Sequence, residues 1–126
     1  MKTVSFAELE DMCAECGGLT VSLEGYGDIE EIRIMILEDP DGRWRANWAR
    51  LMDDGEIIYG SRDDCIFSAD MREALCSVLE DGAGLDDARD YGFDVFGVRR
   101  PYDPSRVGLA GGTEAWDNYE YATDLI

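Results

Sequence analysis

The segment "GGLTVSLEGYGDIEEIRIMIL", residues 17–37, decides the fold, because it predicts two strands that follow directly on a helix. In its first half, Leu19, Val21 and Leu23 alternate with polar residues, a pattern typical of a strand with one buried face. The run 32–37 is apolar except for Arg33, as in a strand at the centre of a sheet. We interpret the two runs as the first hairpin of an antiparallel sheet.

The preceding helix is predicted by its two ends and by its period. Ser5 and Glu8 form the pattern of a capping box, and Gly17 is the residue type that commonly closes a helix. Between these ends, the apolar residues fall on one side of a 3.6-residue period. They are Phe6, Leu9, Met12, Cys13 and Cys16.

Downstream of the hairpin, the sequence predicts further strands and a second helix. Trp44, Ala46 and Trp48 share one face of a strand, and the turn 53–56 leads into the short run 57–60. A second helix is predicted to start at a Ser68 cap and to end at Gly82. A short helix around 85–92 and a strand over 93–98 follow.

These elements predict an α+β fold: an antiparallel meander of three to five strands with two main helices packed on one face. The expected order is α-β-β-β-(β)-α, followed by the short helix, the strand and a tail. We expect residues 1–108 to form one domain, since 126 residues are too few for two ordinary ones. Residues 109–126 form a glycine-led tail of acids and aromatics, which we expect to pack on that domain.

Cys13 and Cys16 fit three interpretations: zinc ligands, a redox pair or core residues. A structural zinc site needs four ligands, and because the chain has no histidine, the other two could only be Cys65 and Cys76. These two are too far apart in the sequence to form a second close pair like Cys13 and Cys16. A redox pair is disfavoured because the two thiols lie in the last, negative turn of the helix. The core interpretation explains both the spacing and the glycines, so we expect no metal and no cofactor.

The charge of the chain restricts its partners. Against 29 acids there are 11 bases, which gives a formal net charge of −18. A field of this sign repels nucleic acid and anionic membranes, so we expect direct binding to neither. The sequence has no signal peptide pattern and no apolar run long enough to span a bilayer, which predicts a soluble, cytoplasmic protein with reduced thiols.

Catalysis is also disfavoured. The chain has no histidine, no nucleophile elbow and no phosphate-binding glycine loop, so we expect a protein that is not an enzyme. Paired carboxylates are frequent, but with this many acids they arise by chance, and most lie where aspartate shapes turns. The arginines at 43–50 and 99–106 are interpreted either as ion-pair partners of nearby acids or as a basic patch on the outer face of the sheet.

Dense carboxylates on a folded surface resemble the phosphate array of DNA. The sequence therefore predicts a protein-binding module whose most concrete form is an inhibitor or immunity-type partner of a basic, nucleic-acid-acting protein such as a nuclease, as in anti-defence proteins of phages and mobile elements. The alternative is an intracellular regulatory or assembly domain that binds through aromatic surface. The candidate residues are Glu24, Asp28, Glu30 and Glu31 at the first hairpin, Asp53 and Asp54 at the second turn, Asp63 and Asp64 before the second helix, and Trp116 and Tyr119 in the tail.

Overall fold

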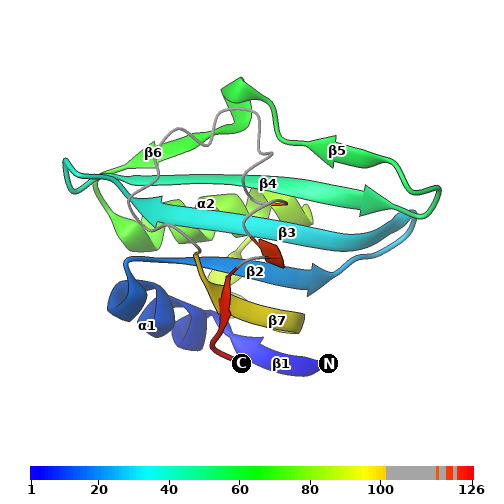
Figure 1. Ribbon diagram of the computed structural model, residues 1–126, viewed down its shortest axis with the longest axis horizontal. Helices are drawn as coiled ribbons and strands as arrows, with labels where there is room; N and C mark the ends of the chain where they lie inside the picture. The colour runs from blue at the N-terminus through cyan, green and yellow to red at the C-terminus, as the bar shows by residue number, and fades with distance from the viewer. Residues whose placement is uncertain (102–115, 117–118, 121) are drawn as a thin grey trace.

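The computed structural model describes residues 1–101, 116, 119–120 and 122–126, and it shows an α+β fold with one antiparallel sheet (Figure 1). The elements in chain order are β1 (Lys2–Ser5), α1 (Phe6–Cys16), β2 (Gly18–Glu24), β3 (Ile29–Glu38), β4 (Trp44–Met52), β5 (Ile57–Tyr59), η1 (Arg62–Asp64), β6 (Ile66–Ser68), α2 (Met71–Ala83), η2 (Ala88–Asp90), β7 (Gly92–Arg100) and β8 (Thr123–Asp124).

The prediction of three to five strands is wrong, because the sheet has eight strands among the described residues. Six strands lie in the order β1-β7-β2-β3-β4-β5, so the predicted meander β2–β5 is only part of the sheet. The other two extend its edges. β5 and β6 pair with different parts of β4: β5 with its end and β6 with its start. In the same way, β1 pairs with the start of β7 and β8 with its end. The chain also begins with a strand rather than with the predicted helix.

Both helices pack on the same face of the sheet. α2 lies against β3 and β4, α1 lies against β2 and β7, and the two helices touch each other (Figure 1). One apolar cluster fills the space between the helices and the sheet. Its fully buried members include Leu9, Cys13, Leu19, Val21, Ile32, Ile34, Leu75, Leu79 and Val98. Among the described residues, no helix has the length and apolar character needed to cross a membrane.

The ends of α1 confirm the sequence prediction. The Ser5 hydroxyl accepts a hydrogen bond from the Glu8 N–H at 3.1 Å, and Gly17 closes the helix with φ at 69°. Gly18 also has a positive φ, 145°, and its Cα lies against the backbone of β3. The glycine pair thus lets the chain leave α1 and enter β2 without an intervening loop.

The predicted ends of α2 need correction. Asp70 caps the helix by accepting from the N–H groups of Arg72 and Glu73, whereas Ser68 lies at the end of β6. The helix closes at Gly84, with φ at 67°, and Gly82 lies inside it. Gly82 is buried against the sheet. A Cβ at this position would lie 2.5 Å from the Ile34 Cδ1 atom, so the absence of a side chain lets α2 approach the sheet closely.

The outer face of the sheet, opposite the helices, is buried over much of β2 and β3. Thr20 and Ser22 alternate with the core residues of β2, yet both are fully buried, and Arg33 is only 9% exposed. Met35 and Leu37 form a small apolar cluster on this face, against which Cys65 packs. Because both faces of β3 are buried here, the run 32–37 carries apolar residues on both faces, with Arg33 as the one exception.

Candidate protein-binding surface

The two turns at one end of the sheet lie side by side and carry the candidate acids. The β2–β3 turn and the β4–β5 turn both lie at this end (Figure 1), and the Asp53 N–H donates a hydrogen bond to the Asp28 carbonyl oxygen at 2.8 Å. Six carboxylates on or next to the two turns are exposed. We call this set the acidic end; it consists of Glu24, Asp28, Glu30, Asp53, Asp54 and Glu56.

Local hydrogen bonds hold both turns in place. Ile29 N–H donates to the Tyr26 carbonyl at 2.9 Å, and Gly27 takes the left-handed conformation that this turn requires. In the second turn, one carboxylate oxygen of Asp54 accepts from the Glu56 N–H at 2.9 Å. Asp54 therefore shapes its turn, as the sequence suggested, and the exposed carboxylates of both turns face solvent.

The acidic end contains like charges with no basic partner among the described residues. Glu24 stands directly opposite Glu31 in the β2–β3 register, an arrangement that costs stability. Glu31 is half-buried and forms an ion pair with Arg33, so it differs from the six exposed acids. None of those six takes part in the five ion pairs of the described residues. Their charges therefore remain available to a partner.

The arginines on the outer face are engaged within the chain. Arg45 pairs with Asp39 at 3.1 Å, and Arg99 pairs with Asp124 at 2.6 Å. Desolvation raises the pKa of Asp39, but hydrogen bonds from the Arg43 N–H, the Arg45 side chain and the Asp41 N–H outweigh it and leave the pKa below its ordinary value. Arg45 and Arg99 thus follow the ion-pair interpretation, whereas Arg50 donates to the carbonyl oxygens of Asp81 and Gly82. Arg106 lies outside the described residues.

Asp63 and Asp64 lie in η1, on a different loop from the acidic end. One carboxylate oxygen of Asp64 accepts from both the N–H and the hydroxyl of Ser61, at 2.7 and 2.8 Å, so this carboxylate closes its own turn. The charge of Asp64 also affects the pKa of Asp81, near the end of α2. Desolvation, followed by the charges of Asp64 and Glu80, raises the pKa of Asp81 above its ordinary value.

Replacing Asp81 with asparagine is expected to stabilise the protein at pH 7. Because the folded-state pKa of Asp81 is raised, its ionisation costs stability at neutral pH, and this cost disappears as the pH falls through that pKa. Asp81 is exposed and lies at the negative end of α2, so we expect a gain of about 0.5 kcal/mol. Thermal unfolding followed by circular dichroism should show the gain at pH 7 and a smaller one at pH 4, with Asp86→Asn as the control. A lower melting temperature for Asp81→Asn at pH 7 would contradict this.

Trp116 and Tyr119 pack on two arginines of the outer face, and we call these four residues the aromatic clasp. The Arg33 guanidinium lies 3.6 Å from the centre of the Trp116 ring and 4.5 Å from that of Tyr119. Arg99 lies 4.3 Å from the Tyr119 ring and donates to the Tyr119 carbonyl. Both residues are half-buried, and Arg33, which both rings contact, also pairs with Glu31 opposite Glu24. The start of the predicted tail, residues 109–115, lies outside the described residues.

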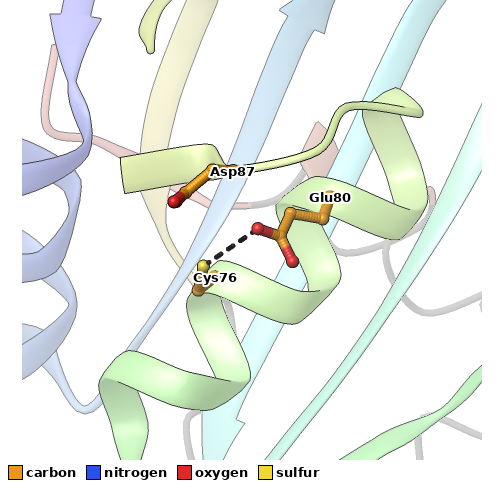
Figure 2. Close-up of side chains that lie close together, drawn as sticks. All are labelled: Cys76, Glu80 and Asp87. Atoms are coloured by element: carbon orange, nitrogen blue, oxygen red, sulfur yellow. Dashed lines mark hydrogen bonds between the residues drawn. The ribbon is translucent and has the colours of Figure 1, made fainter. Parts of the chain in front are cut away.

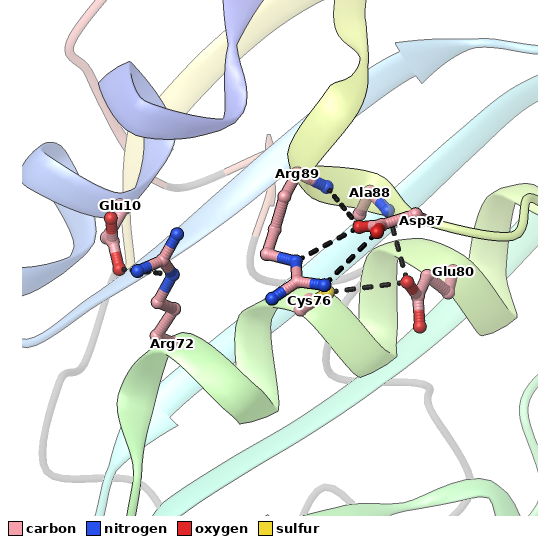
Figure 3. Close-up of polar contacts among 7 residues, drawn as sticks. All are labelled: Glu10, Arg72, Cys76, Glu80, Asp87, Ala88 and Arg89. Carbon is pink, nitrogen blue, oxygen red and sulfur yellow. Dashed lines mark hydrogen bonds and ion pairs between the residues drawn. The ribbon is translucent and has the colours of Figure 1, made fainter.

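Cys76, Glu80 and Asp87 are the described residues whose ligand atoms come close enough for a metal ion, within 4.8 Å of one another (Figure 2). Their groups are already used within the chain. The Cys76 thiol and the Ala88 N–H both donate to Glu80, and Arg89 binds both oxygens of Asp87 at 3.1 Å (Figure 3). Burial, the hydrogen bond to Glu80 and the charge of Glu80 raise the pKa of Cys76, which opposes thiolate ligation. The network thus holds η2 against α2.

The four cysteines form no disulfide and lie apart from one another, except for Cys13 and Cys16 on α1. Cys13 is buried in the core, where burial and then the neighbouring Cys16 raise its pKa to about 12. Cys16 is half-exposed at the end of α1, Cys65 packs on the opposite face of the sheet, and Cys76 lies on α2. Within the described parts of the chain, no ligand group contains two of them. The raised pKa of Cys13 fits the core interpretation of that residue.

A pocket next to the acidic end was not anticipated from the sequence. It has a volume of about 230 Å³, and its wall includes Glu24 and Tyr26 from the β2–β3 hairpin together with Tyr91, which directly precedes β7, and Asp94 in β7. These residues come from segments about 65 positions apart, so no local pattern joins them. The only signal in the sequence is a tyrosine at a turn made otherwise of glycines and acids.

Comparisons with known proteins give no relative: no family model, no curated protein and no solved structure matches the chain.

Proposed function

We propose that the protein is a non-enzymatic binding module that docks a basic, nucleic-acid-acting protein against its acidic end, as an inhibitor or immunity-type partner does. The observation that carries this proposal is the convergence of six exposed carboxylates on two hydrogen-bonded turns, with no basic partner among the described residues. Carboxylates in such an array offer a basic groove the charge that phosphates would offer.

The cost of this arrangement supports a role in binding. Elsewhere in the described chain, arginines form ion pairs with some of the acids, as Arg33, Arg45, Arg89 and Arg99 do. At the acidic end, six exposed acids gather on two adjacent turns, and none of them takes part in an ion pair of the described residues. A concentrated negative field of this kind speeds association with a basic protein and makes the affinity depend on salt.

The proposal is for binding rather than catalysis because the acids lie on exposed turns. General acid–base chemistry needs carboxylates in a site that shifts their pKa values apart. None of the four cysteines takes part in a disulfide, which fits a reducing compartment, and we place the proposed interaction in the cytoplasm. We leave Trp116 and Tyr119 out of the proposed interface, since their rings contact Arg33 and Arg99 of the same chain.

The test compares two triple variants with the same net charge. The first removes three charges from the acidic end (Asp28→Asn, Asp53→Asn and Asp54→Asn); asparagine at 54 keeps the acceptor for the Glu56 N–H. The control removes three exposed charges elsewhere (Asp11→Asn, Asp41→Asn and Asp86→Asn). Partners are captured with the wild-type protein from a lysate at 50 mM salt, identified, purified and titrated against all three proteins.

We expect a basic partner whose affinity falls steeply between 50 and 300 mM salt. The acidic-end variant should bind it at least about tenfold more weakly at low salt and show a shallower salt dependence, whereas the control should stay within about twofold of wild type. Nucleic acid should compete with the wild-type protein for the same partner. Recovery of only acidic or neutral partners, or equal losses in both triple variants, would contradict the proposal.

A further inference from the structure

The outer face of the sheet holds the ring of Tyr119 between two strands that are not neighbours. The ring centre lies 4.5 Å from the Arg33 guanidinium on β3 and 4.3 Å from the Arg99 guanidinium on β7. Because β2 lies between β3 and β7 in the sheet, the ring lies across β2. Two guanidiniums thus bind one ring through cation–π contacts.

A glycine makes room for the end of this ring. Ser22 on β2 pairs with Arg33 on one side and with Gly97 on the other. A Cβ at position 97 would lie 2.7 Å from the Tyr119 hydroxyl oxygen, so the glycine leaves the space that the ring uses. We call Ser22, Arg33, Gly97 and Arg99 the ring site.

The strand beneath the ring is polar although it is buried. Ser22 and Thr20 are fully buried, and their hydroxyl oxygens have no hydrogen-bond partner within the described chain. A buried hydroxyl without a partner costs stability, and an apolar side chain of the same shape avoids that cost. Water can pair with these hydroxyls only when the face is uncovered. The polar strand therefore suits a face that opens as well as closes.

The C-terminal residues bind the ring site through groups that another peptide can supply. The Arg33 guanidinium donates to the Trp116 carbonyl oxygen at 3.0 Å, and Arg99 donates to the Tyr119 carbonyl oxygen. Asp124 pairs with Arg99, although its side chain is 68% exposed. β8, which contains Asp124, adds only two residue pairs to the sheet. Aromatic rings, carbonyl oxygens and a carboxylate are thus the groups that these arginines bind.

We propose that the ring site docks an acidic, aromatic peptide of a partner protein, and that the chain's own C-terminal residues close this site in the free protein. The occupant follows from charge complementarity, because the two guanidiniums bind a ring and a carboxylate together. The tethered residues compete at an effective concentration of about millimolar, so a partner peptide must bind more tightly to enter. A hydrogen bond to the Ser22 or Thr20 hydroxyl gives it that advantage.

The net charge of −18 slows the approach of such a peptide but leaves the contact itself to nearby groups. At physiological salt, charges more than about 8 Å apart are largely screened, so Arg33 and Arg99 dominate the field at the ring site. The ring site and the acidic end bind ligands of opposite charge. The proposal is therefore independent of the basic partner proposed for the acidic end, and either one can fail alone.

The test uses a fluorescein-labelled peptide with the sequence of residues 114–126, EAWDNYEYATDLI, and measures its fluorescence anisotropy against the whole chain at 150 mM salt. Combining Trp116→Ala and Tyr119→Ala in the protein removes both rings of the clasp and leaves the ring site intact. This double variant should bind the peptide saturably and at least about tenfold more tightly than the wild-type chain, whose own rings occupy the site. If the double variant unfolds, Tyr119→Ala alone opens the site.

Further substitutions locate the binding. In the double variant, Arg99→Met should weaken peptide binding about fivefold, whereas Arg43→Met, at an exposed arginine elsewhere, should change it by less than about twofold. A peptide with leucine in place of the aromatic residues at positions 116 and 119 should bind about five- to tenfold more weakly.

The polar strand is tested in the wild-type chain. Ser22→Ala and Thr20→Val remove hydroxyls that have no partner within the described chain while the clasp is closed. Each should raise the melting temperature by about 2–4 °C and reduce acrylamide quenching of Trp116. Thr3→Val is the control, because the Thr3 hydroxyl donates to Asp94 at 2.7 Å and its loss should bring no gain.

The proposal is overturned if the double variant shows no saturable binding, if it binds the peptide no better than the wild-type chain, or if the leucine peptide binds equally well. Lower melting temperatures for both Ser22→Ala and Thr20→Val would remove the argument for a face that opens. Light scattering covers a second copy as the occupant: wild-type dimers that dissociate in the double variant would assign the ring site to the C-terminal residues of another copy and overturn the assignment to a partner protein.

Discussion

Replacing Gly18 with alanine is expected to destabilise the protein by about 3–5 kcal/mol, enough to lower the melting temperature by more than about 10 °C. Gly18 has φ at 145°, a conformation that L-residues rarely adopt. Its added Cβ would collide with the Ile36 carbonyl oxygen and would lie 2.9 Å from the Leu37 Cδ2 atom. The carbonyl belongs to the β3 backbone and has no room to move, so the β2–β3 pairing must loosen.

The neighbouring glycine supplies the control. Gly17 also has a positive φ, 69°, but a Cβ there would meet no atom within 4 Å. Gly17→Ala should therefore cost only the backbone strain, about 1 kcal/mol. Chemical unfolding followed by tryptophan fluorescence measures both variants. Equal losses at the two positions would show that the close approach of β2 to β3 contributes nothing, and the argument for Gly18 would be wrong.

The sequence predicts the elements whose signals are local. α1 has its cap, its apolar stripe and its closing glycine within thirteen residues, and the structure confirms all three. β2, β3 and β4 are long enough to show a period. By contrast, β1, β6 and β8 have four, three and two residues, too few for a pattern. Their identity as strands depends on partners far along the chain, such as Val95 for Lys2.

The error at the start of α2 has the same origin. Ser68 and Asp70 are both good helix caps, and sequence alone does not choose between them. In the structure Ser68 pairs with Trp44 at the end of β6, so its backbone is extended and the helix starts two residues later, at the Asp70 cap. A long-range pairing therefore decides between two equivalent local signals.

The candidate surface was predictable in part. Acids in the turns 24–28 and 53–56 are visible in the sequence, and a meander brings alternate turns to the same end of the sheet. The pocket was not predictable, because Tyr26 and Tyr91 line the same pocket only once β7 lies between β1 and β2. The burial of Thr20 and Ser22 was also hidden, since their alternation with apolar residues is typical of a solvent-facing side.

Arg33 is the second position at which a single change should have a large effect, because one guanidinium serves three partners. It forms an ion pair with Glu31, donates to the Trp116 carbonyl at 3.0 Å and stacks on the rings of Trp116 and Tyr119. Its side chain is 11% exposed. Without it, Glu31 would be left half-buried opposite Glu24 with no positive charge, and the aromatic clasp would lose its central group.

Arg33→Met is therefore expected to cost about 3 kcal/mol of stability, since breaking a buried pair leaves an uncompensated charge. It should also loosen the clasp, so that Trp116 becomes more accessible to acrylamide quenching of its fluorescence. The other two tryptophans, Trp44 and Trp48, are 7% and 9% exposed in the core and should contribute little to the change. Arg33→Lys should recover part of the stability through the charge, but less of the clasp, because an ammonium lacks the planar face of guanidinium.

Arg43→Met provides the matched control, because it removes the same charge from an exposed residue and should change stability by no more than about 0.5 kcal/mol. An equal loss in the two variants would assign the effect to the net charge of the chain rather than to the contacts of Arg33. Full stability of Arg33→Met with unchanged quenching would show that the clasp does not depend on this residue. A loss confined to Arg33, with greater quenching, would tie the C-terminal residues to the charge balance of the β2–β3 hairpin, because the same guanidinium that holds Trp116 and Tyr119 also neutralises Glu31 beside the acidic end.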